Sequence, residues 1–158
     1  IIAVDKKGDW LKTVYSRANF VKSMLLKHKR SIVWIDSDAQ ILQYPDLFDN
    51  LEVDFAAHFL DTKTLYGGGY PKDVDLLGGT MFFNYNEKTL KLVDDWISNN
   101  ETMPKQQLSQ WVLHETIKKF DGKILNLPPT YCQIFDSMAG LGEPVIEHYV
   151  KSRSFRNA

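Results

Sequence analysis

Two carboxylates one residue apart follow a short apolar run near the first quarter of the chain. The run at 31–35, Ser-Ile-Val-Trp-Ile, is typical of a buried central strand, and Asp36-Ser37-Asp38 ends it. Ligands of open α/β sheets bind outside the carboxyl ends of strands. Carboxylates at this spacing can both reach one hard divalent cation, which could bridge to phosphate oxygens. The alternative is that Asp36 or Asp38 caps the following turn.

A second group of functional side chains lies near the C-terminus. His148 follows the apolar pair Val145-Ile146, and Lys151 and Arg153 come soon after it. A neutral histidine can complete an Asp-plus-His site for manganese. Lys151 as a point charge and Arg153 as a bidentate fork can neutralise phosphate. The alternative is a partly buried strand-end histidine followed by a solvated basic tail.

The third feature is a glycine pair inside an otherwise apolar strand. Gly78-Gly79-Thr80 interrupts the strand expected at 76–84. Glycines in such a position indicate either a β-bulge or close approach of the backbone to a ligand. They are not a nucleotide-binding phosphate loop, because neither G-x-G-x-x-G nor G-K-[ST] occurs in the sequence.

Several other polar residues have an ordinary interpretation beside a functional one. Arg17 lies in an expected amphipathic helix, and Gln106 and Gln107 begin another, where they could face a cleft or solvent. The other histidines show no ligand spacing and are expected to be structural or exposed: His28, His58 and His114. Cys132, the single cysteine, allows no internal disulfide and no Cys-based zinc site, and is expected to be a small buried residue.

The elements that must position these residues follow an α/β pattern. Strand and helix signals alternate, which predicts a mixed, mainly parallel sheet flanked by helices. A glycine-rich mobile loop is expected at 60–74. Strands are expected at 1–4, 31–35, 53–59, 76–84, 123–127 and in a short segment that ends at His148. Helices are expected from Asp9 to a basic end at 27–30, from the cap Asn86 to Asn99-Asn100, and at 105–119.

Composition limits the class of protein. The chain has 158 residues, 44% of them apolar, which suits one domain over residues 1–158. A formal net charge of −1 argues against broad binding to nucleic acid or anionic membranes. No apolar run reaches the roughly 18 residues of a transmembrane helix. Because the chain begins at Ile1, we expect a fragment or a processed form.

These segments together resemble the nucleotide-diphospho-sugar transferases of the GT-A fold, in a family of bacterial, phage and large-virus glycosyltransferases. The resemblance extends in order over nearly the whole chain. It also implies that a first strand of the fold is missing before Ile1, which bears on base specificity. The matching segments are 8–10, 17–21, 33–39, 44–48, 78–84, 127–132 and 144–153.

The resemblance implies roles at the metal and phosphate site. Asp38 would be the main direct metal ligand, with Asp36 nearer the ribose and sharing in metal binding. His148 would be the C-terminal metal ligand. Lys151 and Arg153 would face the diphosphate. The implied cofactor is Mn²⁺ or Mg²⁺, and the implied donor is a nucleotide sugar, with UDP favoured.

The resemblance also implies roles around the donor. Arg17 stands where the family usually carries a lysine that reaches the nucleotide. Gly78 and Gly79 would let the backbone approach the donor sugar. Gln107 would correspond to a polar residue beside that sugar, although Gln106 replaces an acidic residue common in the family.

The chemistry implied is departure of a nucleoside diphosphate from an anomeric carbon. An inverting enzyme also needs a carboxylate base for the acceptor hydroxyl, and the candidates are Asp136 and Asp75. A retaining enzyme needs no such base, and the sequence does not choose between the two. The loop at 60–74 is of the kind that gates acceptor access.

The resulting hypothesis is a metal-dependent glycosyltransferase acting on a glycan or protein acceptor. It implies the cytoplasm of a bacterium or infected host cell, with the Golgi lumen as the alternative. The competing hypothesis is a non-catalytic module that binds a nucleotide sugar or glycan. A phosphohydrolase with Asp36 as nucleophile is disfavoured, because Gln40 stands where such enzymes usually have Thr or Val.

Overall fold

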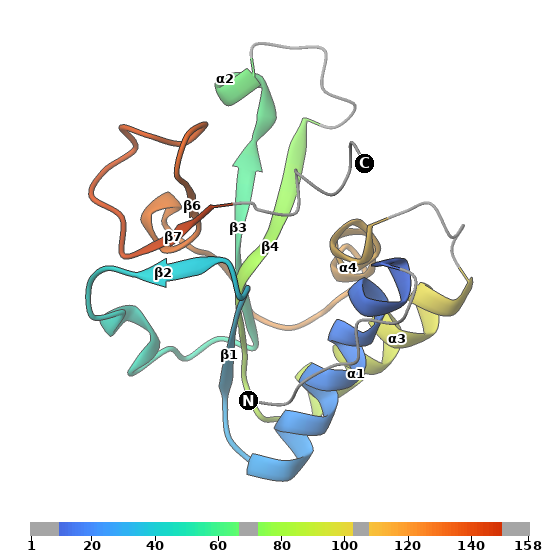
Figure 1. The fold of residues 1–158 in the computed structure, drawn as a ribbon. Helices are drawn as coiled ribbons and strands as arrows, with labels where there is room; N and C mark the ends of the chain where they lie inside the picture. The colour runs from blue at the N-terminus through green and yellow to red at the C-terminus, as the bar shows by residue number, and fades with distance from the viewer. Residues whose placement is uncertain (1–9, 67–72, 103–107, 150–158) are drawn as a thin grey trace. The chain divides into compact units, whose positions relative to one another are not determined.

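The structure, a computed structural model, describes residues 10–66, 73–102 and 108–149. Side chains are described from Ser16 onward, except those of Thr64 and Tyr66. Packing divides the chain into two compact units: Ile1–Ile32 with Asn84–Gly122, and Val33–Phe83 with Lys123–Ala158. The first unit is helical and the second contains the sheets (Figure 1). Among the described residues, no helix is long and apolar enough to cross a membrane.

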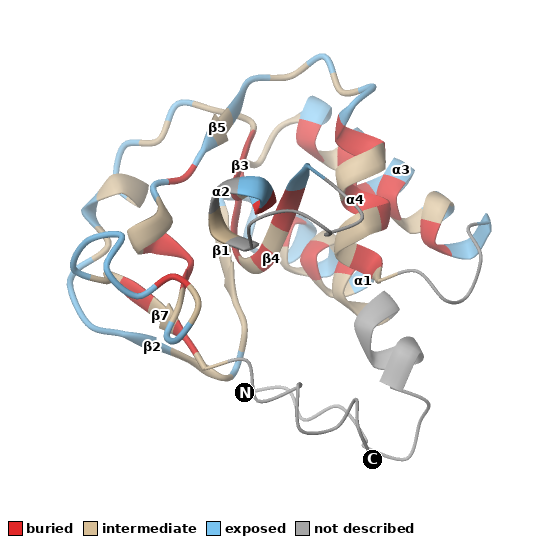
Figure 2. Cartoon of the chain, turned by 90° about the horizontal axis from the view of Figure 1, so that it is seen from above, coloured by how far each residue is buried: buried red, intermediate tan, exposed pale blue. Residues whose placement is uncertain are grey.

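Three helices form the first unit. They are α1 (Trp10–His28), α3 (Glu87–Thr102) and α4 (Ser109–Ile117), with α1 and α4 both packed on α3. The last turn of α1 contains basic residues, Lys27 and His28, as expected. Lys29 follows the helix in a left-handed conformation with φ 50°, and its N–H donates to Leu25 O at 2.9 Å. Figure 2 shows buried positions along all three helices, and those of α3 and α4 include Leu92, Val93, Trp96, Val112 and Leu113.

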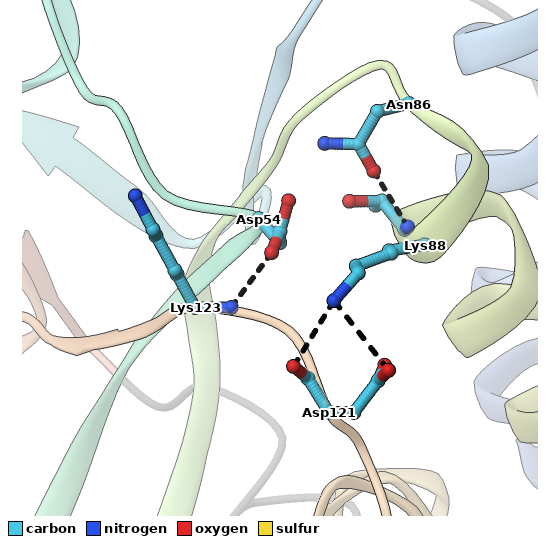
Figure 3. Close-up of polar contacts among 6 residues, drawn as sticks. Asp54, Asn86, Lys88, Asp121 and Lys123 are labelled. Carbon is cyan, nitrogen blue, oxygen red and sulfur yellow. Dashed lines mark hydrogen bonds and ion pairs between the residues drawn. The ribbon is translucent and has the colours of Figure 1, made fainter.

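The two ends of α3 depend on asparagine in different ways. Asn86 caps its start as expected, with Oδ1 accepting the Thr89 N–H at 2.9 Å (Figure 3). The prediction that Asn99-Asn100 ends the helix is wrong, because α3 continues past both. Asn99 Nδ2 donates to Thr116 Oγ1 at 2.9 Å, and Asn100 Oδ1 accepts from the Ser109 hydroxyl at 3.2 Å. These bonds to α4 compensate for the low helix propensity of asparagine.

The main sheet of the second unit has the strand order β1-β4-β3-β5. Its strands are β1 (Ile32–Ile35), β4 (Val74–Phe83), β3 (Phe55–Asp61) and β5 (Ile124–Asn126). β3 runs antiparallel to β4 and parallel to β5, so the expected mixed sheet is confirmed. Asp54 fixes the start of β3 beside β5, because its Oδ2 accepts the Lys123 N–H at 2.6 Å (Figure 3).

A smaller sheet has β7 (Ile146–His148) at its centre. β2 (Ala39–Ile41) pairs antiparallel with β7, and β6 (Gln133–Ile134) pairs parallel with it. Of these three strands, only β7 is predicted by the sequence pattern. The pairing brings the segment after Asp38 beside the segment that contains His148.

One hydrophobic cluster of the second unit joins the two sheets. Its buried members are Ala56, Phe82, Leu127, Tyr131 and Ile146. Phe48, in the short helix η1 (Asp46–Phe48), stacks on Phe82 at 6.2 Å between ring centroids. Tyr131, in η2 (Pro129–Tyr131), meets Phe48 edge-on at 5.4 Å, and its hydroxyl donates to Asp46 Oδ1 at 2.7 Å. This packing fixes the chain that leads into β6.

Two expected segments differ from the structure or lie outside it. The prediction of a loop over 60–74 is wrong at its ends, since β3 continues to Asp61 and α2 (Thr62–Tyr66) follows at once. The Thr62 N–H and hydroxyl both donate to Asp73 O, at 3.0 and 3.1 Å, which joins the end of β3 to the start of β4. Residues 67–72 and the strand expected at 1–4 lie outside the described residues.

Candidate functional site

The glycine pair forms a bulge in β4. Ala57 of β3 pairs with Met81 and His58 pairs with Leu77, so β4 carries three additional residues at this point, 78–80. The expectation of a bulge at Gly78-Gly79 is therefore confirmed. The Asp36 N–H donates to Gly79 O at 2.8 Å, which joins the carboxyl end of β1 to the bulge.

The first aspartate of the pair is held by its own strand. Trp34 Nε1 donates to Asp36 Oδ1 at 2.7 Å, and Asp36 O accepts the Ala39 N–H at 3.1 Å. The turn at 36–39 is therefore closed by the backbone of Asp36, while its carboxylate binds the indole. Asp36 and Asp38 are both partly buried, as expected at the end of a central strand.

The small sheet brings His148 to the aspartates. Ala39 of β2 lies opposite His148 of β7, and the Tyr149 N–H donates to Asp38 O at 3.2 Å. On the other side of β7, the Phe135 N–H donates to His148 O at 3.1 Å. Asp38 and His148, which are far apart in the sequence, therefore lie side by side in the second unit.

The His148 side chain packs into the bulge. It is only 4% exposed, and its Nε2 lies 2.8 Å from Thr80 Oγ1. Its ring covers Gly79 so closely that a Cβ on this residue would lie 2.7 Å from His148 Cε1 and 2.8 Å from Nδ1. Only glycine fits beneath the ring. We call Asp36, Gly79, Thr80, Cys132 and His148 the bulge cluster.

Cys132 is the buried thiol of this cluster. It is 2% exposed, so its interpretation as a small buried residue is confirmed. Burial raises the pKa of the Cys132 thiol to about 12, hydrogen bonds with Thr80 and Gly79 act in the opposite direction, and the charge of Asp36 raises the pKa further. The thiol therefore stays protonated at neutral pH and does not serve as a nucleophile.

The donor chemistry around the bulge fits a divalent cation. Asp36, Asp38 and His148 offer carboxylate oxygens and an imidazole nitrogen, a set that Mn²⁺ accepts. Within the described ranges, no group of three or more His, Cys, Asp and Glu side chains is already arranged as a metal site. The ligand set Asp36, Asp38 and His148 therefore stays a prediction.

The other predicted donor residues fall in different places. Gly78 is buried in the bulge, and Arg17 lies partly buried in α1 of the helical unit. Gln107, together with its neighbour Gln106, lies outside the described residues, as do Lys151 and Arg153. Their roles stay predictions.

The two candidate bases differ in exposure. Asp75 is buried in β4, with 4% of its surface exposed. Asp136 is exposed and follows β6, where its Oδ1 accepts the Ser137 N–H at 2.6 Å.

His58 has a structural role, as expected: its Nδ1 donates to Leu127 O at 2.8 Å. Burial lowers the pKa of His58, which keeps the ring neutral.

The contact of Thr80 with His148 is the part of the site that sequence reasoning missed. In the sequence, Thr80 is only the residue that follows the two glycines. The signal available was its position in the bulge, where an inward hydroxyl needs a partner. The identity of that partner depends on the β2–β7 pairing, which no local pattern reveals.

A separate groove of about 280 Å³ lies on the helical unit. It is lined by charged residues that already pair with one another: Lys88 with Asp121 at 3.4 Å (Figure 3), and Lys91 with Asp95 at 2.6 Å. Nothing in its lining was singled out by the sequence. The bulge cluster is the better candidate site.

Comparison with known proteins supports the fold. No protein-family model and no curated protein matches the sequence. A glycosyltransferase involved in the glycosylation of the major capsid of PBCV-1 matches with a TM-score of 0.73 and 15% identity, over 99% of this chain and 79% of that one. The apo structure of the bifunctional glycosyltransferase WbbM matches with a TM-score of 0.57 and 14% identity, over 91% of this chain and 32% of that one. At such identities the likeness establishes the fold, and the GT-A-type fold expected from the sequence is confirmed.

Proposed function

We propose that this chain is a metal-dependent glycosyltransferase that moves a sugar from a nucleotide-diphosphate sugar, with UDP as the favoured nucleotide, to a glycan or protein acceptor. One observation carries the proposal: Asp36-Ser37-Asp38, at the carboxyl end of β1, lies beside His148 at the glycine bulge of β4. The fold shared with two glycosyltransferases supports it.

The proposed reaction separates charge at the donor. Negative charge builds on the departing nucleoside diphosphate while the sugar becomes oxocarbenium-like. Asp38 and His148 would hold a divalent cation, with Asp36 nearer the ribose. When bound, that cation would stabilise the leaving phosphate electrostatically. Lys151 and Arg153 are proposed to neutralise the same charge.

The remaining roles follow from size and exposure. Gly78 and Gly79 are together proposed to let the backbone of β4 approach the donor sugar. Arg17 is proposed to reach the nucleotide and Gln107 the sugar. If the reaction inverts the anomeric centre, the exposed Asp136 is preferred as base over the buried Asp75.

The first test is calorimetric titration of UDP and GDP into the protein, with Mn²⁺ and again with EDTA. We expect binding that requires Mn²⁺ and that Asp38→Ala weakens by roughly 100-fold or more. Glu52→Ala is the matched control, because it removes one exposed negative charge from the same unit and leaves the bulge intact. Unfolding temperatures should be the same for all three proteins.

Two outcomes separate the alternatives. Nucleotide binding that persists unchanged in EDTA and in Asp38→Ala would contradict the proposed metal site. Metal-dependent binding, followed by a panel of UDP-sugars in which neither hydrolysis nor transfer occurs, would favour a non-catalytic module that binds nucleotide sugars.

A further inference from the structure

The hydroxyl of Thr80 makes a short buried contact with His148. Oγ1 lies 2.8 Å from Nε2, Thr80 is 0% exposed, and His148 is 4% exposed. A polar contact in such a dry place is costly to leave unmade and is stronger than the same contact in water. The side chain of threonine is also stiff at χ1, which gives the hydroxyl a defined direction.

Other contacts already restrict the His148 residue. Its backbone is fixed on both sides, because β7 pairs with β2 at Ala39 and with β6 at Ile134. One face of its ring lies against Gly79. The freedoms that remain are rotation of the ring about χ2 and the choice of the protonated ring nitrogen, and the contact of Nε2 with Thr80 Oγ1 acts on both.

The surroundings of Thr80 favour a restraining role for its hydroxyl. A hydroxyl group can donate one hydrogen bond and accept two. The buried thiol of Cys132 lies near enough to the Thr80 side chain for Thr80 to influence its pKa. With His148 Nε2 at 2.8 Å and the buried thiol nearby, the Thr80 hydroxyl has little freedom to reorient.

We propose that Thr80 is a positioning residue of this site, whose hydroxyl accepts a hydrogen bond from the protonated Nε2 of His148 and so holds the ring in that tautomer and in one orientation. The benefit to metal binding rests on the proposed function, in which His148 is a ligand. Histidine ligands generally need a hydrogen-bond partner on their other nitrogen, and removal of that partner typically weakens metal binding by about 10- to 100-fold. The restraint on the ring exists whether or not a cation binds.

The test compares Thr80→Val, which keeps the shape and removes the hydroxyl, with Thr80→Ser, which keeps the hydroxyl. Imidazole ¹⁵N spectra of the metal-free proteins should show one His148 tautomer in the wild type and in Thr80→Ser, and a mixture in Thr80→Val. The affinity for Mn²⁺ in the presence of UDP, measured by electron paramagnetic resonance, should fall roughly 10- to 100-fold in Thr80→Val and recover in Thr80→Ser.

The outcomes are distinguishable from failure of the proposed function. A folded Thr80→Val protein with the wild-type tautomer of His148 would overturn the positioning role. If the wild type binds no Mn²⁺ with UDP, the metal proposal fails, and the tautomer spectra alone decide the role of Thr80. Thr80→Ala removes the same hydroxyl and takes the place of Thr80→Val if the valine variant does not fold.

Discussion

At the scale of single residues, the packing of His148 depends on the absence of a Cβ at Gly79. The His148 ring lies only 2.7 Å from the position that the Cβ of any other residue at position 79 would occupy. The ring cannot retreat easily, because the backbone of His148 is paired with strands on both sides. The bulge thus selects glycine for packing against a side chain as well as for backbone freedom.

Gly79→Ala should therefore displace His148. A Cβ at 2.7 Å from Cε1 cannot be accommodated without movement, and overpacking of this kind costs about 1–3 kcal/mol in the free energy of unfolding. Urea denaturation would measure the loss, and titration of UDP with Mn²⁺ should show weaker binding.

The double variant Gly79→Ala with His148→Ala is the control for that prediction. Removal of the ring frees the space, so the alanine at position 79 should cost less stability in this background than in the wild type. Metal-dependent binding of UDP should not recover in the double variant, because the proposed ligand His148 has been removed. Equal costs in the two backgrounds would show that the ring is not what the Cβ meets.

At the scale of elements, caps and tertiary partners act differently on the same residue type. Asparagine is a good N-cap and a poor interior residue of a helix. Asn86 behaves accordingly, whereas Asn99 and Asn100 stay helical because α4 supplies partners for both. Asn100-Glu101-Thr102 matches the Asn-x-Thr pattern of an N-glycosylation site. Because Asn100 is only 9% exposed, its side-chain nitrogen is poorly accessible for glycosylation in the folded chain.

Asn86→Ala should lower the free energy of unfolding by about 1 kcal/mol, because the Thr89 N–H loses its acceptor at the start of α3. Asn86→Asp, which keeps an acceptor and adds a charge favourable to the helix dipole, should retain the stability. Urea denaturation of the three proteins measures the difference. An alanine variant as stable as the wild type would show that this cap contributes nothing.

Sequence patterns predicted the long elements and also the short strands β5 and β7, but missed β2 and β6. The helical spacing of Val21 and Leu25 and the apolar run before Asp36 are local signals, and α1 and β1 follow them. β2 and β6 have only three and two residues, too few to show a period of two, and they exist because β7 lies between them. The position of His148 next to Asp38 is set by this pairing, so the site was predictable as separate motifs and not as contacts.

At the scale of the whole molecule, the fold is shared with a protein whose sequence is very different. A likeness that covers 99% of the chain coexists with 15% identity. Apolar strands, capped helices and a glycine bulge can be encoded by many sequences, since the core requires size and polarity more than identity. Under the proposed function, the residues whose chemistry matters are those at the bulge and at the end of β1.

Ligand binding should raise the stability of the whole protein. A ligand at 100 times its Kd adds about 2.7 kcal/mol, which corresponds to an increase in Tm of about 5–10 °C for a chain of this size. We expect this increase with UDP and Mn²⁺ together in differential scanning fluorimetry, and little change with UDP and EDTA. The same increase with Asp38→Ala would contradict binding through the proposed metal site.

The buried thiol of Cys132 makes the protein convenient for site-specific spectroscopy. Burial raises the pKa of the Cys132 thiol to about 12 and leaves it 2% exposed, so the reactive thiolate is scarce at pH 7. The chain has no other cysteine. A maleimide or spin label should therefore react only with a cysteine introduced at an exposed position, so distance changes caused by a donor nucleotide can be followed without removing a native residue.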